Sequence, residues 1–389
     1  MRIGFFTDTY RPYISGAVTS MENSSLQLRA LGHEVTTFAP RYPQSPDDAE
    51  GITKFPSFAF PGYEGLRITA PFPRKKLDQN FRLDIVHAHS PFIMGRLGLR
   101  FAQENNLPTV FTCHSLYPEY SQYAPFLNSL VETVIEDYLV QFCNKCQRII
   151  APSQIVKNII KNWGVAVPIS VVPTGIDTTN FGSGLDSSWV RRSFGVSEGD
   201  KMLLYVGRLA KEKRLGFLLR SFGKLIHADN NRYHLVLAGE GPELPELRNL
   251  ATKLRIAHKV TFVGPLPHEK VVSCYKEADL FLFASTIETQ GLVLMEAMTA
   301  GLPVVAVDSA VTREVVTHGN DGFIVANSED AMMRSIVELN SSEDLLREVG
   351  QRAAERARQF TVEFLTKRLL QAYEETITDW KSHAVRARR

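Results

Sequence analysis

The stretch LFLFASTIETQGLVLMEAMTAGLPVVAV, residues 280–307, contains two short apolar runs separated by a helical pattern. Residues 280–284 and 303–307 are rich in Leu, Phe, Val and Ala without polar alternation, which is typical of strands buried on both faces. Between them, apolar residues recur at helical spacing after Gly291. A strand, a helix and a strand in this order predict two parallel strands joined by a crossover helix.

The same alternation runs through the chain in two arrays, separated by a turn-rich break at residues 173–177. We therefore predict two Rossmann-like, doubly wound α/β domains, over residues 1–172 and 173–361. A last helical pattern, within residues 362–389, has no strand after it, and we expect it to cross back and pack on the first domain. The other predicted strands are residues 2–7, 34–39, 84–88, 109–113, 148–151, 169–172, 202–206, 234–238, 260–263 and 323–325.

Composition narrows the class of protein. The 389 residues are 44% hydrophobic and carry a net charge of only +2, which argues against a protein that mainly binds nucleic acid. No run approaches the ~20 apolar residues of a spanning helix, and Asp8 interrupts any apolar run of signal-peptide length at the start. We expect a cytoplasmic protein, soluble or lying on a membrane surface. The sequence does not indicate an oligomeric state.

The four cysteines do not suggest a disulfide framework in a chain of this length. Cys143 and Cys146 have CxxC spacing, but no second pair of ligands that would complete a zinc site follows. We expect both to be reduced and packed in or beside a helix. No metal site is predicted.

Ligands of open α/β sheets bind beyond the carboxyl ends of the strands, so polar residues there are candidates for a site. The strongest set follows the strand at 280–284. Gly291 permits close backbone approach at a helix start whose free N–H groups suit a phosphate. Glu288 and Glu296 can face one ligand, and Glu296 lies among apolar residues, so it needs a partner. Sugar hydroxyls would serve, as would a nearby arginine.

Four cations lie within residues 207–214, GRLAKEKR, directly after the strand at 202–206. Cations are normally unfavourable where a helix starts, but a diphosphate bound there would be neutralised by them. We single out Arg208 and Lys213, which bracket the turn. The alternative is a solvated charged loop.

Weaker signals lie at other strand ends. His114 ends the strand at 109–113, while His87 and His89 end the strand at 84–88 and are more typical of structural residues. Gly16 lies in the loop after the first strand. The Gly239-Glu240-Gly241 turn does not complete a dinucleotide fingerprint.

Taken together, these segments resemble the retaining glycosyltransferases of the two-Rossmann (GT-B) fold that carry an E-x7-E motif. The likeness covers nearly the whole chain, and its pieces occur in the family's order. They are the Gly16 loop, His114, P-T-G-I-D at 173–177, G-R-L-x-K-E-K from Gly207, G-E-G-P from Gly239, and Glu288 with Glu296. Many relatives have Gly-Gly in the first loop, where this chain has Ser15-Gly16-Ala17.

The resemblance implies a domain cleft that holds a sugar nucleotide, and catalysis by His114, Arg208, Lys213 and Glu288. Arg208 and Lys213 would stabilise the departing diphosphate, so no metal would be required and no cofactor is expected. Glu288 would contact the sugar, Glu296 the ribose, and His114 the reacting oxygens. The implied donor-binding set is Gly16, Gly207, Arg208, Lys213, Leu266, Glu288, Gly291, Leu292, Val293 and Glu296.

A closer likeness is to the bacterial diacylglycerol glucosyltransferases, through TDTY at 7–10, HAHSP at 87–91, HSLYPEY at 114–120 and ETQG at 288–291. It implies transfer of glucose from UDP-glucose to 1,2-diacylglycerol at the inner face of the cell membrane. Aromatic and cationic residues of the first domain suit an anionic lipid surface, although they also fit a core with a solvated rim. They are Phe55, Phe58, Phe60, Tyr63, Arg67, Phe72, Arg74, Lys75, Lys76 and Arg82.

Three alternatives remain at this stage. The same transfer could use a soluble acceptor such as a sugar phosphate, a hydroxy acid or a polysaccharide. A nucleotide-dependent oxidoreductase shares the fold class, but the fingerprint of a dinucleotide site is missing. A sugar-nucleotide sensor without catalysis is disfavoured, because the catalytic set is intact.

Overall fold

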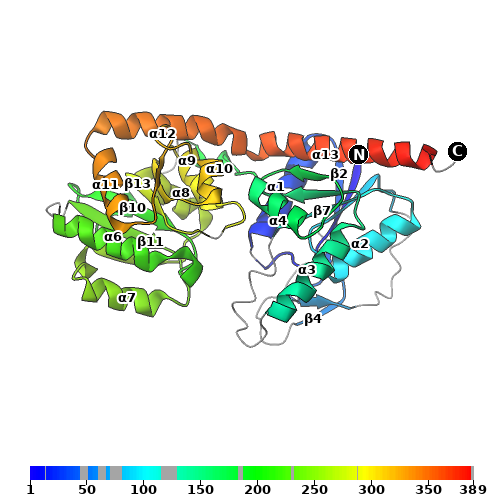
Figure 1. Cartoon of the computed structure of the whole chain (residues 1–389), viewed down its shortest axis with the longest axis horizontal. Helices are drawn as coiled ribbons and strands as arrows, with labels where there is room; N and C mark the ends of the chain where they lie inside the picture. Colours follow the sequence, from blue (N-terminus) through cyan, green and yellow to red (C-terminus); the bar gives the residue numbers. More distant parts are fainter. Residues whose placement is uncertain are drawn as a thin grey trace. The chain divides into compact units, whose positions relative to one another are not determined.

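The computed structural model describes residues 1–13, 15–43, 51–59, 67–70, 81–114, 129–182, 187–228, 232–286 and 288–386. Its chain divides into two compact units (Figure 1). Unit 1 contains Met1–Gly175 together with Val362–Arg389, and unit 2 contains Ile176–Thr361. The final helix, α13 (Val362–Arg386), therefore belongs to the unit formed by the start of the chain.

Unit 1 is built on a seven-stranded sheet whose described pairings are all parallel. β1 (Arg2–Phe6) lies between β2 and β6, and the strand order reverses at this point. In doubly wound sheets a ligand binds at such a switch point. The full order is β3 (Ile52–Phe55), β2 (Glu34–Pro40), β1, β6 (Ile85–Ala88), β7 (Thr109–Thr112), β8 (Arg148–Ala151) and β9 (Ile169–Val171).

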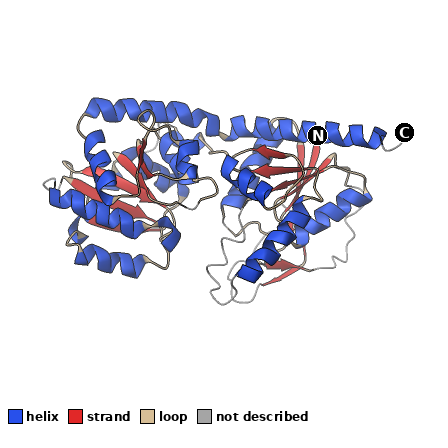
Figure 2. Cartoon of the chain, viewed as in Figure 1, coloured by secondary structure: helices blue, strands red, loops and turns tan. Residues whose placement is uncertain are grey.

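Helices cover both faces of this sheet (Figure 2). On one face, Phe5 of β1 packs in a cluster with Val18 and Met21 of α1 (Gly16–Ala30) and Tyr373 of α13. On the other, Phe6 packs with residues of α2 (Ile93–Glu104), while α3 (Ser129–Cys143) and α4 (Gln154–Asn162) contribute to a neighbouring cluster. Alternate residues of β1 thus enter opposite layers, which explains its lack of polar alternation.

Unit 2 repeats this plan on a six-stranded parallel sheet, with its switch point between β10 and β13. Leu203 and Tyr205 of β10 enter the cluster on one face, and Met202 and Leu204 enter the cluster on the other. The order is β12 (Val260–Gly264), β11 (Tyr233–Ala238), β10 (Lys201–Val206), β13 (Leu280–Phe283), β14 (Val304–Val307) and β15 (Phe323–Val325).

The helices of unit 2 divide between these faces. The face of Leu203 is covered mainly by α6 (Leu215–Ala228), α7 (Leu244–Lys253) and α11 (Glu329–Leu339). The face of Met202 is covered by α5 (Trp189–Phe194), α8 (His268–Glu277), α9 (Leu292–Thr299), α10 (Ala310–Val315) and part of α12 (Glu343–Ala357).

All twelve predicted strands are present, and both units have the predicted doubly wound α/β architecture. Three short strands had no sequence prediction: the edge strand β3 and a two-stranded antiparallel sheet of β4 (Ser57–Ala59) and β5 (Arg67–Thr69). Polar residues interrupt all three, and most of their residues are half-buried or exposed, so no buried apolar run marks them in the sequence.

The aromatic and cationic residues of unit 1 that could face a membrane lie in different surroundings. Phe55 is buried in β3 against Phe38, so of the two alternatives left open by the sequence it belongs to the core and not to a membrane surface. Phe58 is exposed, and Arg67 is bonded to Ser57 within the small sheet. Phe60, Tyr63, Phe72, Arg74, Lys75 and Lys76 lie outside the described residues.

Candidate active site

Three neighbouring strands of unit 2 end at, or just before, a glycine in a backbone conformation that L side chains rarely adopt. Gly207 follows β10, Gly239 follows β11 and Gly264 ends β12, with φ of 145°, 145° and 82°. Parallel strands bring these glycines to one edge of the sheet. There Gly207 and Gly239 border a cavity of about 660 Å³, whose lining also includes Arg208, Glu240, Gly241 and Leu244.

Close backbone packing requires a glycine at positions 239 and 241. A Cβ atom on Gly239 would lie 2.0 Å from the carbonyl oxygen of Gly207, and one on Gly241 would lie 2.3 Å from that of Leu209. The backbone N–H of Leu209 donates to Glu240 O, and that of Glu243 donates to Leu209 O. The Gly239-Glu240-Gly241 turn, a weak signal in the sequence, therefore forms a wall of this cavity.

Lys213 is directed at Glu288. Its Nζ lies 2.5 Å from Glu288 Oε1, and the two side chains are only 22% and 17% exposed. Lys213 ends a short 3-10 helix, Lys211–Lys213, and the following residue, Arg214, has φ 55° and donates to Ala284 O at the end of β13. These contacts hold the cationic turn against the loop that carries Glu288.

Arg208 lies differently. Its Nη2 is 2.6 Å from Glu212 Oε1, and its side chain is 52% exposed. Arg208 lines the glycine cavity, whereas Lys213 meets the acidic loop.

Glu296 finds its partner within the protein. The hydroxyl of Tyr275, on α8, donates to Glu296 Oε2 at 2.9 Å. Neither a sugar hydroxyl nor an arginine is needed to explain this carboxylate. Burial raises the pKa of Glu296, and burial together with the Glu296 charge raises the pKa of Tyr275 well above its usual value. Sequence reasoning missed Tyr275, because nothing in the chain order links it to residue 296.

The remaining predicted donor-binding residues of unit 2 lie at the start of α9 and just after the end of β12. Gly291 has φ 71° and precedes α9. The first N–H groups of a helix generally have no partner within it, although that of Leu294 donates to Gly291 O at 3.0 Å. Leu292, Val293 and Leu266 are partly buried and pack on one apolar cluster of unit 2.

The switch point of unit 1 gathers histidines. His114, after β7, has Nε2 at 3.0 Å from Nδ1 of His89, which follows β6. Burial lowers the pKa of His114 to about 4 and that of His89 well below its usual value, so both are neutral at pH 7. His87 is structural, as predicted: it bonds Tyr373 and Thr112 at 2.6 Å each. His89, also expected to be structural, contacts the candidate catalytic histidine.

Gly16 begins α1, whose first turn is capped by the Ser15 side chain. Nearby in sequence, Asp8 follows β1 and accepts the N–H of Met94 and the hydroxyl of Ser90, at 3.0 and 2.5 Å. Burial raises the pKa of Asp8. Because α2 has no side-chain cap of its own, Asp8 takes that role. This partner was not predicted, since the two segments are 82 residues or more apart.

Models of known protein families match both units of the chain. The model of the glycosyltransferase family 4 matches residues 14–180, and that of the glycosyl transferases group 1 matches residues 188–356. The alpha-monoglucosyldiacylglycerol synthase of Streptococcus pneumoniae is 33% identical over 79% of this chain and 71% of its own. The chain belongs to the family 4 glycosyltransferases. The synthase of the same name from Acholeplasma laidlawii is 30% identical over 89% and 90%.

Solved structures agree with the fold of this glycosyltransferase. Anabaena HepE in complex with UDP and glucose has a TM-score of 0.74 at 19% identity, and covers 96% of this chain and 100% of its own. Sucrose-phosphate synthase from Thermosynechococcus elongatus has a TM-score of 0.76 at 20% identity, with 97% and 100% covered. At these identities the likeness concerns the fold.

Two further findings concern the described part of the enzyme. No helix there is both long enough and apolar enough to cross a membrane. No group of three or more His, Cys, Asp or Glu residues is arranged to hold a metal ion. Cys143 and Cys146 are buried free thiols, as expected, and burial raises the pKa of Cys146 to about 12.

Proposed function

We propose that this glycosyltransferase transfers glucose from UDP-glucose to 1,2-diacylglycerol, with retention of anomeric configuration and without a metal or other cofactor. The observation that carries the proposal is the Lys213–Glu288 pair at the carboxyl edge of the unit 2 sheet. It holds a cation and a carboxylate at the edge where doubly wound sheets bind their ligands.

The cations have a definite task in this proposal. Departure of the nucleotide builds negative charge on the diphosphate, and donors already held in place stabilise that charge without reorganising. Lys213 and Arg208 are these donors, while Glu288 contacts the transferred sugar. The acceptor hydroxyl attacks on the face that the diphosphate leaves, and the leaving phosphate takes its proton.

The other residues bind the donor. Backbone N–H groups of Gly291, Leu292 and Val293 face phosphate, as the first turn of a helix favours. Glu296, oriented by Tyr275, holds the ribose hydroxyls, and the segment at Leu266 meets the base. Gly207 leaves room for the diphosphate. From unit 1, His114 acts on the sugar as a neutral imidazole, and Gly16 borders the diphosphate.

The lipid acceptor is supported by the two relatives named alpha-monoglucosyldiacylglycerol synthase. Unit 1 also exposes large apolar side chains: Phe58, Phe92 and Val134 are 51%, 45% and 60% exposed. Exposed aromatics suit the interface of a bilayer. We propose a peripheral protein on the cytoplasmic face of the cell membrane.

A soluble acceptor is the second candidate. Other relatives are named D-inositol 3-phosphate glycosyltransferase, from Nocardia farcinica (29% identical over 94% of this chain), and N-acetyl-alpha-D-glucosaminyl L-malate synthase, from Bacillus anthracis (24% over 95%). Both names describe small acceptors. In that case the same donor site would act without lipid.

The test is release of UDP from UDP-glucose with and without dispersed diacylglycerol, in the presence of a chelator. We expect release that depends on lipid. Glu288→Ala should lower kcat/KM by about 100-fold, the scale of one lost transition-state contact. Lys224→Ala, an exposed cation of α6 paired with Asp330, is the control and should be unaffected. Release that requires a soluble acceptor would favour the second candidate, and wild-type rates in Glu288→Ala would reject both.

A further inference from the structure

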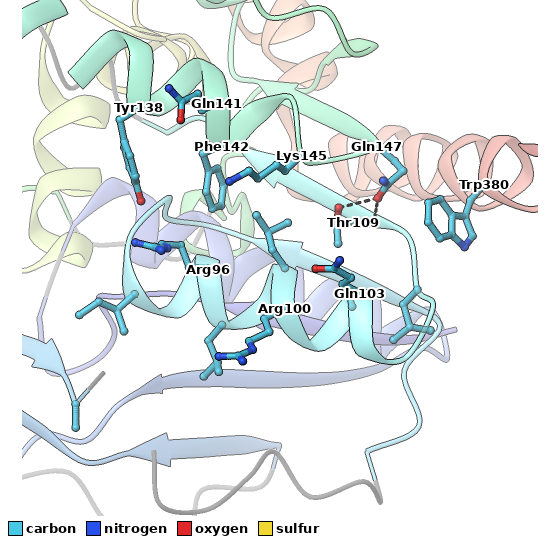
Figure 3. Close-up of a pocket in the computed structure, with 16 residues that line it drawn as sticks. Arg96, Arg100, Gln103, Thr109, Tyr138, Gln141, Phe142, Lys145, Gln147 and Trp380 are labelled. Carbon is cyan, nitrogen blue, oxygen red and sulfur yellow. Dashed lines mark hydrogen bonds between the residues drawn. The ribbon is translucent and has the colours of Figure 1, made fainter. Parts of the chain in front are cut away.

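Unit 1 has a groove away from the switch point of its sheet, between α2 and α3 (Figure 3). Its volume is about 950 Å³, within the range of sites that enclose a small molecule. Arg96, Arg100 and Gln103 reach it from α2, at spacings of four and three residues that place them on one side of the helix. Tyr138, Gln141 and Phe142 of α3 line the opposite side.

All charged side chains in the described lining of this groove are positive. It includes Arg96, Arg100 and Lys145, and no Asp or Glu. Arg100 forms an exposed pair with Glu104 at 3.3 Å, and neither Arg96 nor Lys145 forms an ion pair with a described residue. Two of the three cations, Arg96 and Lys145, therefore have no counterion among the described residues, which favours an anion, and phosphate is a good partner for guanidinium and ammonium groups.

A neutral donor adds to the cations. The side-chain oxygen of Gln147 accepts both the N–H and the hydroxyl of Thr109, at 2.7 Å each. These two bonds hold the amide in place at the groove wall (Figure 3). The Gln147 carbonyl is already used, so its NH2 group is the part that remains for a ligand.

The groove also has an apolar wall. Leu97, Leu99, Leu107, Phe142 and Trp380 all contribute, the last from α13. Arg96 and Trp380 lie near opposite ends of the groove, with Lys145 between them (Figure 3). A ligand that fills this space therefore combines an anionic head with an apolar tail.

We propose that the groove binds one molecule of an anionic phospholipid. The headgroup phosphate lies between Arg96 and Lys145, and an acyl chain follows the apolar wall towards Trp380. The site is separate from the proposed acceptor, because diacylglycerol carries no charge for these cations to meet. The proposal does not depend on the identity of the acceptor, since its test measures lipid binding and not sugar transfer.

The experiment titrates the full chain with dihexanoylphosphatidylglycerol below its micelle concentration, so that monomers rather than a charged surface are offered. Heat of binding and tryptophan fluorescence are recorded. We expect saturable one-to-one binding, and binding of dihexanoylphosphatidylcholine or inorganic phosphate that is at least about 10-fold weaker. Among the described tryptophans only Trp380 lines the groove, so Trp380→Phe should abolish the fluorescence change and keep the heat.

The matched variants each remove two cations of unit 1. Arg96→Gln with Lys145→Gln should weaken binding by at least about 10-fold, since a hydrogen bond to a charged group is lost at each site. Lys157→Gln with Lys161→Gln, on α4, changes net charge equally and should leave it unaltered. Thermal unfolding confirms that both are folded. The proposal is overturned by absent saturation, by equal affinity for the two lipids, by equal losses in both variants, or by a fluorescence change that survives Trp380→Phe.

Discussion

At the scale of single residues, the candidate site contains pairs of side chains that are distant in sequence. Lys213 and Glu288 are 75 positions apart and share a bond of 2.5 Å. Both side chains are largely buried, so removal of one leaves the other as a poorly compensated charge. The pair therefore acts as a unit, and the effects of its two members should not add.

A double-mutant cycle tests this coupling. Lys213→Ala and Glu288→Ala should each lower kcat/KM by about 100-fold, but the double variant should lose at least about 10-fold less than the product of the two. The control cycle uses Lys224→Ala and Asp330→Ala, an exposed pair at 2.9 Å that should show near wild-type rates and simple additivity. Additive losses at Lys213 and Glu288 would mean that the two residues act independently.

At the scale of elements, the carboxyl ends of β10, β11 and β12 are shaped by glycines. Gly239 combines φ 145° with a carbonyl oxygen 2.0 Å from where its Cβ would lie. No rotation of a side chain can relieve that contact, because the neighbouring atom is backbone. The strand ends can approach this closely only when Gly239 has no side chain, and the cavity wall depends on that approach.

Gly239→Ala should therefore destabilise unit 2 by about 1–3 kcal/mol, the usual cost of a strained backbone conformation, and should weaken UDP binding. Gly199→Ala is the matched control, because a Cβ there meets nothing within 4 Å. Urea unfolding gives the free energies, and calorimetric titration with UDP gives the affinity. Equal stability and equal affinity in the two variants would show that this wall tolerates a side chain.

At the scale of the whole molecule, unit 1 contains three histidines that are neutral because they are buried. Burial lowers the pKa of His87, His89 and His114 below the ordinary value of 6.5. Below pH 6.5 the unfolded chain binds protons at these histidines that the folded chain does not bind. Their contribution to the free energy of unfolding is therefore fully present above pH 6.5 and is lost as the pH falls. Burial raises the pKa of Asp8, which acts in the opposite direction.

His114→Asn isolates one of these contributions. Between pH 7.5 and 5.5, the wild-type free energy of unfolding should fall by roughly 1 kcal/mol more than that of the variant, since one pKa unit is worth about 1.4 kcal/mol. The Asp8 contribution is common to both proteins. A Trp189→Phe background leaves Trp163 and Trp380 of unit 1 as reporters of urea unfolding. Identical pH dependence in the two proteins would contradict the inferred neutral state of His114.

Much of the fold of this enzyme was predictable from its sequence, because the signals lie within short segments of the chain. All twelve predicted strands exist, because a strand buried on both faces needs an unbroken apolar run that is visible without knowledge of its neighbours. The same holds for Gly291, which precedes a helix, and for the cationic turn after β10. The strands β3, β4 and β5 were missed because polar residues interrupt them and most of their residues are half-buried or exposed, so they lack the buried apolar run.

The sequence alone therefore determined two parallel α/β arrays and the strand ends at which a site could form. Only the tertiary structure decided which side chains meet: Tyr275 with Glu296, His89 with His114, Asp8 with the start of α2, and Glu212 with Arg208. The physical reason is range. Burial patterns and backbone preferences act over a few neighbouring residues, whereas hydrogen bonds and ion pairs join whatever the packed sheets bring within about 3 Å.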